Sequence, residues 1–212
     1  NGTKIINSGA ISTFTERAVV SENRLIKISR DVPPNIAALL GCAVPTGGGV
    51  VLNSLSFAPG KTLAIYGMGG IGLSALLTAV SVGYEVIAID VNEQKLKRAG
   101  ELGAKHLIDA SKMNPLEEII KIKSKGVDYA IETSGSKKAM EQAFQSISFR
   151  GKTIIVGNLR IGETISIDPF SLIQGKQIFG SWGGESKIDR DIPIYTEMHS
   201  AGRLPLERII SK

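Results

Sequence analysis

The sequence predicts a doubly wound α/β fold with a six-stranded parallel sheet and helices on both of its faces. From about residue 61 onward, short runs rich in Val and Ile alternate with helical stretches, an order typical of βαβ units. The runs are almost continuously apolar, as expected for strands that are buried on both faces. A glycine-rich string directly follows the first run. Six strands is the number found in a Rossmann sheet of order 3-2-1-4-5-6.

Each element can be placed from this alternation. The expected strands are Thr62–Tyr66, Glu85–Ile89, Lys105–Ile108, Val127–Glu132, Lys152–Val156 and Gln177–Gly180. The expected helices between them are Ile71–Val82, Glu93–Leu102, Pro115–Ile122 and Ser136–Ser146. The interval before the last strand departs from the pattern, because it holds a short extended run, Thr164–Ile167, and a brief helix near Phe170.

The first sixty residues follow another pattern. Two short strands are expected at Glu16–Val20 and Arg24–Ile28, and two helices at Asn35–Leu40 and Gly48–Leu55. Such a segment is too short to bury a core of its own. We therefore expect residues 1–32 to be the last strands of a second domain, and residues 33–212 to form the α/β domain.

Composition excludes several classes of protein. With 42% hydrophobic and 21% charged residues the chain is an ordinary globular one, and no apolar run approaches the roughly 18 residues that span a bilayer. The net charge is +5, which raises nucleic acid as a partner. The densest cationic cluster is Lys121, Lys123 and Lys125 at an expected helix end, where cations favour the helix dipole. A solvated helix end is therefore the preferred interpretation, and neither nucleic acid nor a membrane is expected as a partner.

Cysteine and histidine are scarce. The one cysteine, Cys42, rules out a disulfide framework and favours a cytoplasmic location. The two histidines, His106 and His199, are too few for a self-contained zinc site. We expect His106 to be structural and His199 to face solvent at a helix end. Trp182 is expected either in the core or as a wall of a ligand site.

The string Gly67-Met68-Gly69-Gly70-Ile71-Gly72 is a G-x-G-x-x-G. It is a specific signal here because a strand precedes it and a helix follows it. Gly67 permits the tight turn, Gly69 lets a pyrophosphate approach the backbone, and Gly72 lets the helix pack closely on the strand. The helix N-terminus then offers unpaired N–H groups and partial positive charge to phosphates. The alternative is a close-packed turn without a ligand.

Asp90 ends the second expected strand, 18 residues after Gly72. A carboxylate there can accept both hydroxyls of an adenosine ribose. It would also repel a 2′-phosphate by roughly 4 kcal/mol at 4 Å in an effective dielectric of 20. The sequence therefore predicts NAD(H) rather than NADP(H). Alternatively, Asp90 or Asn92 caps the next helix, and Lys95 either reaches the same sugar or lies in solvent.

With these residues in hand, the chain resembles the zinc-containing alcohol dehydrogenases of the medium-chain dehydrogenase/reductase superfamily. The most specific likeness is Gly41-Cys42-Ala43-Val44-Pro45-Thr46-Gly47, which is similar to the family's G-C-x-x-x-T-G. The resemblance implies that Cys42 is the last protein ligand of a catalytic zinc and that Thr46 lies beside the nicotinamide. Asp90 and Lys95 match the family's adenosine-ribose segment.

The resemblance also covers the later turns. It implies cofactor contacts at Thr133 after the fourth strand, at Val156, Gly157 and Asn158 after the fifth, and at Ser181 after the sixth. The segment around Ser181 is one residue shorter than in the animal enzymes of the family.

This resemblance implies the cofactor-domain segment of an oxidoreductase that lacks most of the GroES-like catalytic domain. The expected reaction is hydride transfer between an alcohol and an aldehyde or ketone with NAD, assisted by zinc in the intact enzyme. The segment alone is expected to be inactive. The alternatives are a zinc-free NAD(P)-dependent quinone or enoyl reductase of the same superfamily, and a non-catalytic NAD-binding module. The edge of the last strand, Gln177–Gly180, is expected to join subunits of a homodimer or tetramer, as it does in many family members.

Overall fold

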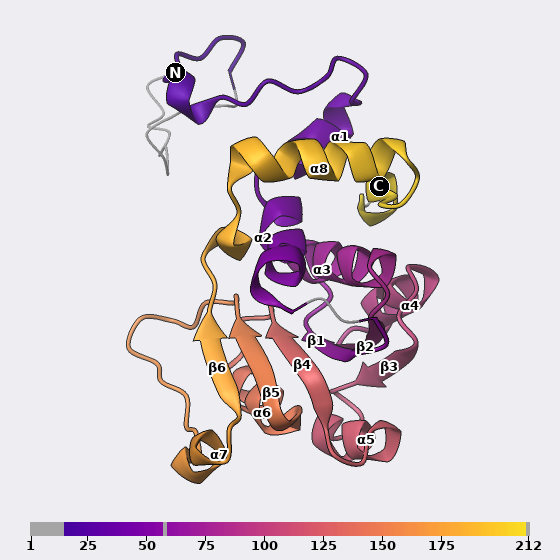
Figure 1. Ribbon diagram of the computed structural model, residues 1–212, viewed down its shortest axis with the longest axis vertical. Coiled ribbons are helices and arrows are strands. Elements are labelled where there is room, and N and C mark those ends of the chain that lie inside the picture. Colours follow the sequence, from indigo (N-terminus) through magenta and orange to yellow (C-terminus); the bar gives the residue numbers. More distant parts are fainter. Residues whose placement is uncertain (1–14, 57–58, 211–212) are drawn as a thin grey trace, which may run out of the picture.

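The computed structural model of the chain describes residues 15–56 and 59–210. Figure 1 shows a single sheet with helices packed against it. The sheet has six strands in the order β3-β2-β1-β4-β5-β6, and every neighbouring pair is parallel. The strands are β1 Thr62–Tyr66, β2 Glu85–Asp90, β3 His106–Asp109, β4 Val127–Glu132, β5 Ile147–Ile155 and β6 Gln177–Gly180. The doubly wound six-stranded parallel sheet is therefore confirmed.

The helices fill the intervals between these strands. They are α1 Pro34–Leu39, α2 Ala43–Gly49, α3 Gly70–Ser81, α4 Glu93–Glu101, α5 Pro115–Ile122, α6 Lys137–Ser146, α7 Pro169–Ile173 and α8 Ile188–Ser200, with shorter turns η1 Glu22–Arg24, η2 Val50–Ser54, η3 Gly183–Glu185 and η4 Leu206–Ile209. No helix in the described ranges is both long and apolar enough to cross a membrane.

Helices cover both faces of the sheet, and successive side chains of a strand point to opposite faces. Leu63 and Ile65 of β1 belong to one apolar cluster, together with residues of α2, α3 and α8. Ala64 and Tyr66 belong to a second cluster, which includes residues of α5 and α6. All five residues of β1 are buried. This explains why the strand runs in the sequence are continuous rather than alternating.

The chain changes direction across the sheet beside β1. It proceeds from β1 to β2 and β3 on one side, and then from β4 to β6 on the other. The carboxyl ends of parallel strands meet at one edge, and such a reversal leaves a crevice there that is the usual place for a ligand in open α/β sheets.

The two strands expected near the N-terminus are absent. Residues Glu16–Val20 and Arg24–Ile28 are irregular, apart from the short turn η1, and Val19 is fully exposed. A strand needs a hydrogen-bonded neighbour, and no described strand pairs with either segment. This expectation was wrong for the described residues, and residues 1–14 lie outside them. The domain boundary between residues 32 and 33 stays a prediction.

The second early helix begins sooner than expected. Instead of Gly48–Leu55, α2 begins at Ala43 and continues through the π-helical turn η2. The glycines disfavour a helix on intrinsic grounds, but they allow close packing. A Cβ on Gly47 would lie 2.2 Å from the carbonyl oxygen of Ile71 in α3. Tertiary contact therefore overrides local propensity here.

Two further differences lie near β5. The strand begins at Ile147 rather than Lys152, and it contains Arg150 with a positive φ of 64°. The run Thr164–Ile167 pairs with no described strand, whereas the brief helix near Phe170 is present as α7.

Candidate functional site

The loop between β1 and α3 is tight at two glycines and open at a third. Gly67 has φ 97°, and its N–H donates to the carbonyl oxygen of Ile89 at 2.8 Å. A Cβ on Gly72 would lie 1.9 Å from the carbonyl oxygen of Gly67. At Gly69, by contrast, no described atom lies within 4 Å of the position a Cβ would take. The first turn of α3 has N–H groups without partners inside the helix, so the loop offers donors beside open backbone, as phosphate sites require.

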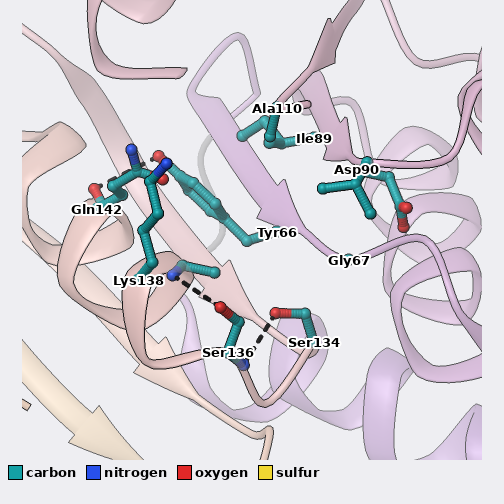
Figure 2. Close-up of a pocket in the computed structure, with 11 residues that line it drawn as sticks. Tyr66, Gly67, Ile89, Asp90, Ala110, Ser134, Ser136, Lys138 and Gln142 are labelled. Atoms are coloured by element: carbon teal, nitrogen blue, oxygen red, sulfur yellow. Dashed lines mark hydrogen bonds between the residues drawn. The ribbon is translucent and has the colours of Figure 1, made fainter. Parts of the chain in front are cut away.

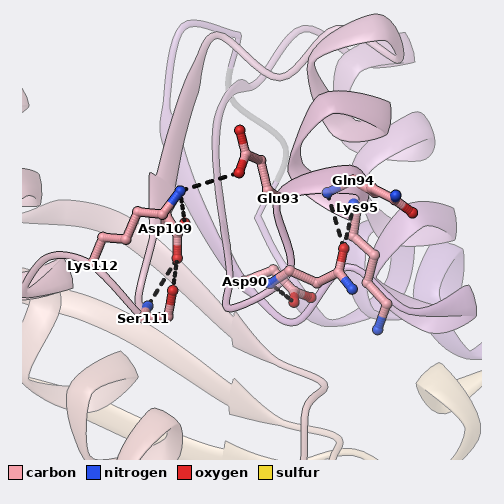
Figure 3. A network of polar contacts seen from close by, with 8 residues as sticks. Asp90, Glu93, Gln94, Lys95, Asp109, Ser111 and Lys112 are labelled. Atoms are coloured by element: carbon pink, nitrogen blue, oxygen red, sulfur yellow. Dashed lines mark hydrogen bonds and ion pairs between the residues drawn. The ribbon is translucent and has the colours of Figure 1, made fainter.

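The Asp90 carboxylate lies against this loop. Its Oδ2 accepts a hydrogen bond from the Met68 N–H at 2.6 Å, and its Oδ1 accepts one from the Asn92 N–H at 2.9 Å. The side chain of Asn92 caps α4, accepting from the N–H groups of Gln94 and Lys95 at 3.0 and 3.1 Å (Figure 3). Helix capping is therefore done by Asn92, and Asp90 is left at the end of β2 beside the loop.

Two hollows flank the loop. A crevice of about 400 Å³ opens at the carboxyl ends of β1 and β2, and Figure 2 shows Asp90 and Lys138 on opposite sides of it. A second, more open hollow of about 830 Å³ lies against Gly69 and includes Lys95. Asp90 thus lines the first hollow, and Gly69 and Lys95 line the second, on the two sides of the same loop.

Thr133 fixes the loop from the neighbouring strand. Its hydroxyl donates toward the carbonyl oxygens of Gly67 at 2.9 Å and Tyr66 at 3.2 Å. The structure therefore places Thr133 under the loop, where it holds the backbone rather than pointing into the crevice.

The turns that follow β5 and β6 reach the same edge. The N–H groups of Val156 and Gly157 both donate to the carbonyl oxygen of Glu132, at 2.9 and 3.1 Å. Asn158 is exposed and its carbonyl lies beside Gly135. Ser181 donates its N–H to the carbonyl oxygen of Ile155 at 2.9 Å. Together with Gly135 in the turn after β4, these residues form a rim beyond β4, β5 and β6.

The segment from Cys42 to Thr46 lies beside the glycine-rich loop. It begins α2, which lies between α3 and the turn after β6. Ala43 is next to Gly70, with 3.7 Å between its Cβ and the position of a Cβ on Gly70. Gly184, with φ 71°, lies so close that its Cβ would be 2.4 Å from the carbonyl oxygens of Pro45 and Thr46 and 3.0 Å from Gly49 Cα. Cys42 is exposed and Thr46 is buried.

No metal site is formed by the described residues alone. Among residues 15–56 and 59–210, no three His, Cys, Asp or Glu side chains are grouped closely enough to hold an ion. A catalytic zinc takes three protein ligands and one open position. Cys42 by itself does not fit that requirement.

Other expected residues have local explanations. His106 is half-buried with its Nε2 3.5 Å from Glu85 Oε1, in keeping with a structural role. His199 was expected to face solvent, but its Nδ1 lies 3.0 Å from the Leu204 carbonyl oxygen, because the chain turns back after α8. Trp182 is 88% exposed, which excludes the core. Lys121 pairs with Glu118 at 2.6 Å and Lys123 with Glu85 at 3.5 Å, so these cations of the basic cluster have acidic partners.

Sequence reasoning missed Glu132. This glutamate ends β4 with no exposed surface, and its Oε1 accepts from Ser134 N–H, Ser134 Oγ and Gly135 N–H at 2.7, 2.5 and 2.9 Å. The available signal was a carboxylate at the end of an otherwise buried strand. Such a position joins the core to the ligand edge of the sheet.

Comparison with known proteins gives consistent results. A family model described as zinc-binding dehydrogenase matches residues 70–198. A Schizosaccharomyces pombe protein named probable S-(hydroxymethyl)glutathione dehydrogenase 1 is 34% identical over 203 residues, covering 94% of this chain and 54% of that protein.

Solved structures of the same kind superpose well. Benzyl alcohol dehydrogenase from Acinetobacter calcoaceticus is 33% identical with a TM-score of 0.92, covering 95% of this chain and 56% of that one. A protein of Sinorhizobium meliloti 1021, described as a zinc-binding dehydrogenase and solved bound to NADP, is 26% identical with a TM-score of 0.79, covering 88% and 54%. The chain thus spans about half the length of these relatives.

Proposed function

This chain belongs to the zinc-binding dehydrogenase family, and from that premise we propose that it holds NAD(H) for hydride transfer between an alcohol and an aldehyde or ketone. The observation that carries the proposal is the loop after β1. It is closed by Gly67 and Gly72 and open at Gly69, as a pyrophosphate site requires.

The proposed binding mode assigns each part of the dinucleotide to one stretch of the edge. The pyrophosphate takes the N-terminus of α3, and the adenosine takes the crevice lined by Asp90 and Ala110. Lys95 reaches the adenosine ribose from the adjoining hollow. The nicotinamide half lies over the rim formed by Val156, Gly157, Asn158 and Ser181, beside Thr46.

NAD(H) is the proposed cofactor in preference to NADP(H). Asp90 keeps two of its acceptor sites occupied by backbone N–H groups, and its remaining lone pairs suit ribose hydroxyls. A 2′-phosphate at the same place would meet a carboxylate of like charge. The NADP-bound relative makes NADP(H) the alternative that the titration below decides.

In the proposed mechanism, the residues of this chain bind the dinucleotide and orient its nicotinamide. When bound, the nicotinamide supplies the carbon that accepts or donates hydride. The rim beyond β4 to β6 would hold the nicotinamide, and α2 borders the site next to the loop. In a protein of the relatives' full length, Cys42 is proposed as one zinc ligand. No step is assigned to a metal, because the described residues do not form a site for one.

Subunit pairing is proposed at the edge strand β6. One side of β6 has no strand neighbour in the described sheet, and unpaired edges favour pairing with another chain. Large apolar side chains are exposed on and around it, namely Phe149, Phe170, Ile173 and Phe179. We propose a homodimer through this edge, with a tetramer as the alternative.

Calorimetric titration of the chain with NAD⁺, NADH, NADP⁺ and ADP-ribose tests the proposal. Binding of NAD⁺ and ADP-ribose, with NADP⁺ at least tenfold weaker, is the expected result. Absence of binding by every one of these ligands would overturn it. We also propose that the protein is a soluble enzyme of the cytoplasm. Fractionation of the source cells tests this location.

A further inference from the structure

The most unusual polar group in the chain is the Glu132 carboxylate. It lies at the carboxyl end of β4 with no exposed surface. Three donors converge on its Oε1, whereas its Oε2 is buried and has no hydrogen-bond partner among the described residues. A buried unpaired carboxylate oxygen is costly. A group of this kind calls for a functional explanation.

Opposing effects act on its protonation. Burial is the largest effect and raises the pKa of Glu132 above its ordinary value, and the hydrogen bonds from Ser134 and Gly135 offset it only in part. The carboxylate also precedes the N-terminus of the ten-residue helix α6, whose positive end favours an anion. The three donors on Oε1 act in the other direction and favour the ionised form, which the proposal below requires.

Glu132 joins the two turns of the rim. Its side chain holds the turn after β4 through Ser134 and Gly135, and its carbonyl oxygen holds the turn after β5 through Val156 and Gly157. The approach is close, since a Cβ on Gly157 would lie 2.6 Å from Oε2 and 2.3 Å from the Gly135 nitrogen. The unpartnered oxygen therefore faces the turn on which the nicotinamide half is proposed to lie.

We propose that Glu132 is a positioning residue whose negative charge favours the oxidised, cationic nicotinamide over the reduced, neutral one. The inference rests on the proposed function, because it requires the dinucleotide to lie over this rim. NAD⁺ and NADH differ at the ring by one positive charge, so a buried carboxylate acts on one form and not on the other. A unit charge at roughly 10 Å in an effective dielectric of 20 changes an equilibrium about tenfold.

The test is calorimetric titration of the chain with NAD⁺, NADH and ADP-ribose, in the native form and in Glu132→Gln. The amide keeps the shape and can still accept on Oε1. We expect the ratio of the NADH and NAD⁺ dissociation constants to fall about tenfold in Glu132→Gln, with ADP-ribose affinity changed less than threefold. A purely structural residue would weaken all three ligands alike and leave the ratio unchanged, which overturns the inference.

Asp128→Asn is the matched control, because it removes the same charge from the opposite end of β4. In Asp128→Asn, the ratio of the NADH and NAD⁺ dissociation constants should stay within twofold of the native ratio. If Glu132→Gln does not fold, Glu132→Asp decides the question. It keeps the charge, so its ratio should also stay within twofold even if both affinities fall, and a fivefold change would overturn the inference. A native chain that binds none of the three ligands would refute the proposed function itself. A change in the ratio of NADH and NAD⁺ affinities in the variants, by contrast, concerns only the role of Glu132.

Discussion

The Met68 N–H donates to the Asp90 carboxylate across 2.6 Å, so the glycine-rich loop and the candidate ribose residue form one hydrogen-bonded unit. The bond is charge-assisted and buried, which makes it stronger than a neutral one. Changes at either residue should therefore affect both parts of the site.

Replacing Asp90 by Ser should weaken NAD⁺ binding and narrow the preference over NADP⁺. The substitution removes a charged acceptor, typically worth about 1.5–3 kcal/mol, and it relieves repulsion of a 2′-phosphate. Titration with both cofactors measures the gap. Asp109→Asn is the control, because Asp109 is the register partner of Asp90 on β3 and binds Ser111 instead. Equal affinity for both cofactors in the unmodified chain would contradict the assignment.

Alanine at two glycines of the loop should separate stability from binding. Gly69→Ala adds a Cβ to open space, so the melting temperature should change little while ADP-ribose affinity falls at least tenfold. Gly72→Ala puts a Cβ 1.9 Å from the Gly67 carbonyl oxygen and should lower both, by about 2 kcal/mol or more of unfolding free energy. Thermal melts and titrations check the pair. Unchanged ADP-ribose affinity in Gly69→Ala would refute the phosphate site.

The chain expressed alone should neither retain zinc nor oxidise alcohols at an enzymatic rate. Cys42 is the one cysteine, and a single thiolate does not hold a catalytic zinc. Without a metal, nothing polarises the alkoxide, a contribution of several kcal/mol. Metal analysis after dialysis and an NAD⁺ reduction assay measure both. Cys42→Ser should then change little in the chain, and stoichiometric zinc in the unmodified chain would contradict the prediction.

Asp128 should stabilise the fold in a pH-dependent way. Burial opposes ionisation, but hydrogen bonds from Lys61 and Thr62 outweigh it and hold the pKa of Asp128 below its ordinary value. A carboxylate whose pKa is lower in the folded state than in the unfolded state stabilises the fold. This stability is fully present above the unfolded-state pKa of about 3.9, and it is lost as the pH falls through the folded-state pKa. Asp128→Ala should therefore cost about 1–3 kcal/mol at pH 7. Denaturant unfolding should show the difference from the native chain shrinking below pH 4; a constant difference would argue against this linkage.

The two sheet edges should differ in their effect on assembly. Phe179→Lys on β6 should shift a dimer to monomer, because it places a charge on the proposed interface. Leu107→Lys on β3 is matched, since the two side chains are 49% and 45% exposed on opposite edge strands. Sedimentation at several protein concentrations measures the change. A native chain that sediments as a monomer throughout would exclude pairing.

The sheet could be predicted from the sequence because its signal is local. Continuous apolar runs and turn residues placed all six strands. Asn92, which caps α4, was one of the two residues that cap chemistry offered for that role. The gathering of the expected site residues at one edge of the sheet could also be predicted, because the carboxyl ends of parallel strands lie together. Their individual roles stay predictions.

What could not be predicted depends on partners far away in sequence. Glu16–Val20 has the composition of a strand, but it pairs with no strand among residues 15–56 and 59–210. The glycines of α2 predict the absence of a helix from local propensity, but they allow α2 to pack closely against α3. The hydrogen bond from the Thr133 hydroxyl to the Gly67 carbonyl oxygen was not foreseen, whereas the expected cofactor contact of Thr133 stays a prediction. Glu132 was overlooked because the donors that single it out belong to the following turn.

The close contact of Gly49 with Gly184 has a consequence for the order of folding. It joins residues that are 135 apart in the chain. Contacts of long sequence separation form slowly, because the entropy of closing the loop is lost before the contact stabilises the chain. Backbone amides of α2 should therefore acquire protection from hydrogen exchange only after β6 and its following turn are in place. During synthesis, the segment that carries Cys42 and Thr46 would leave the ribosome before β6, yet its contact with the turn after β6 would form only later.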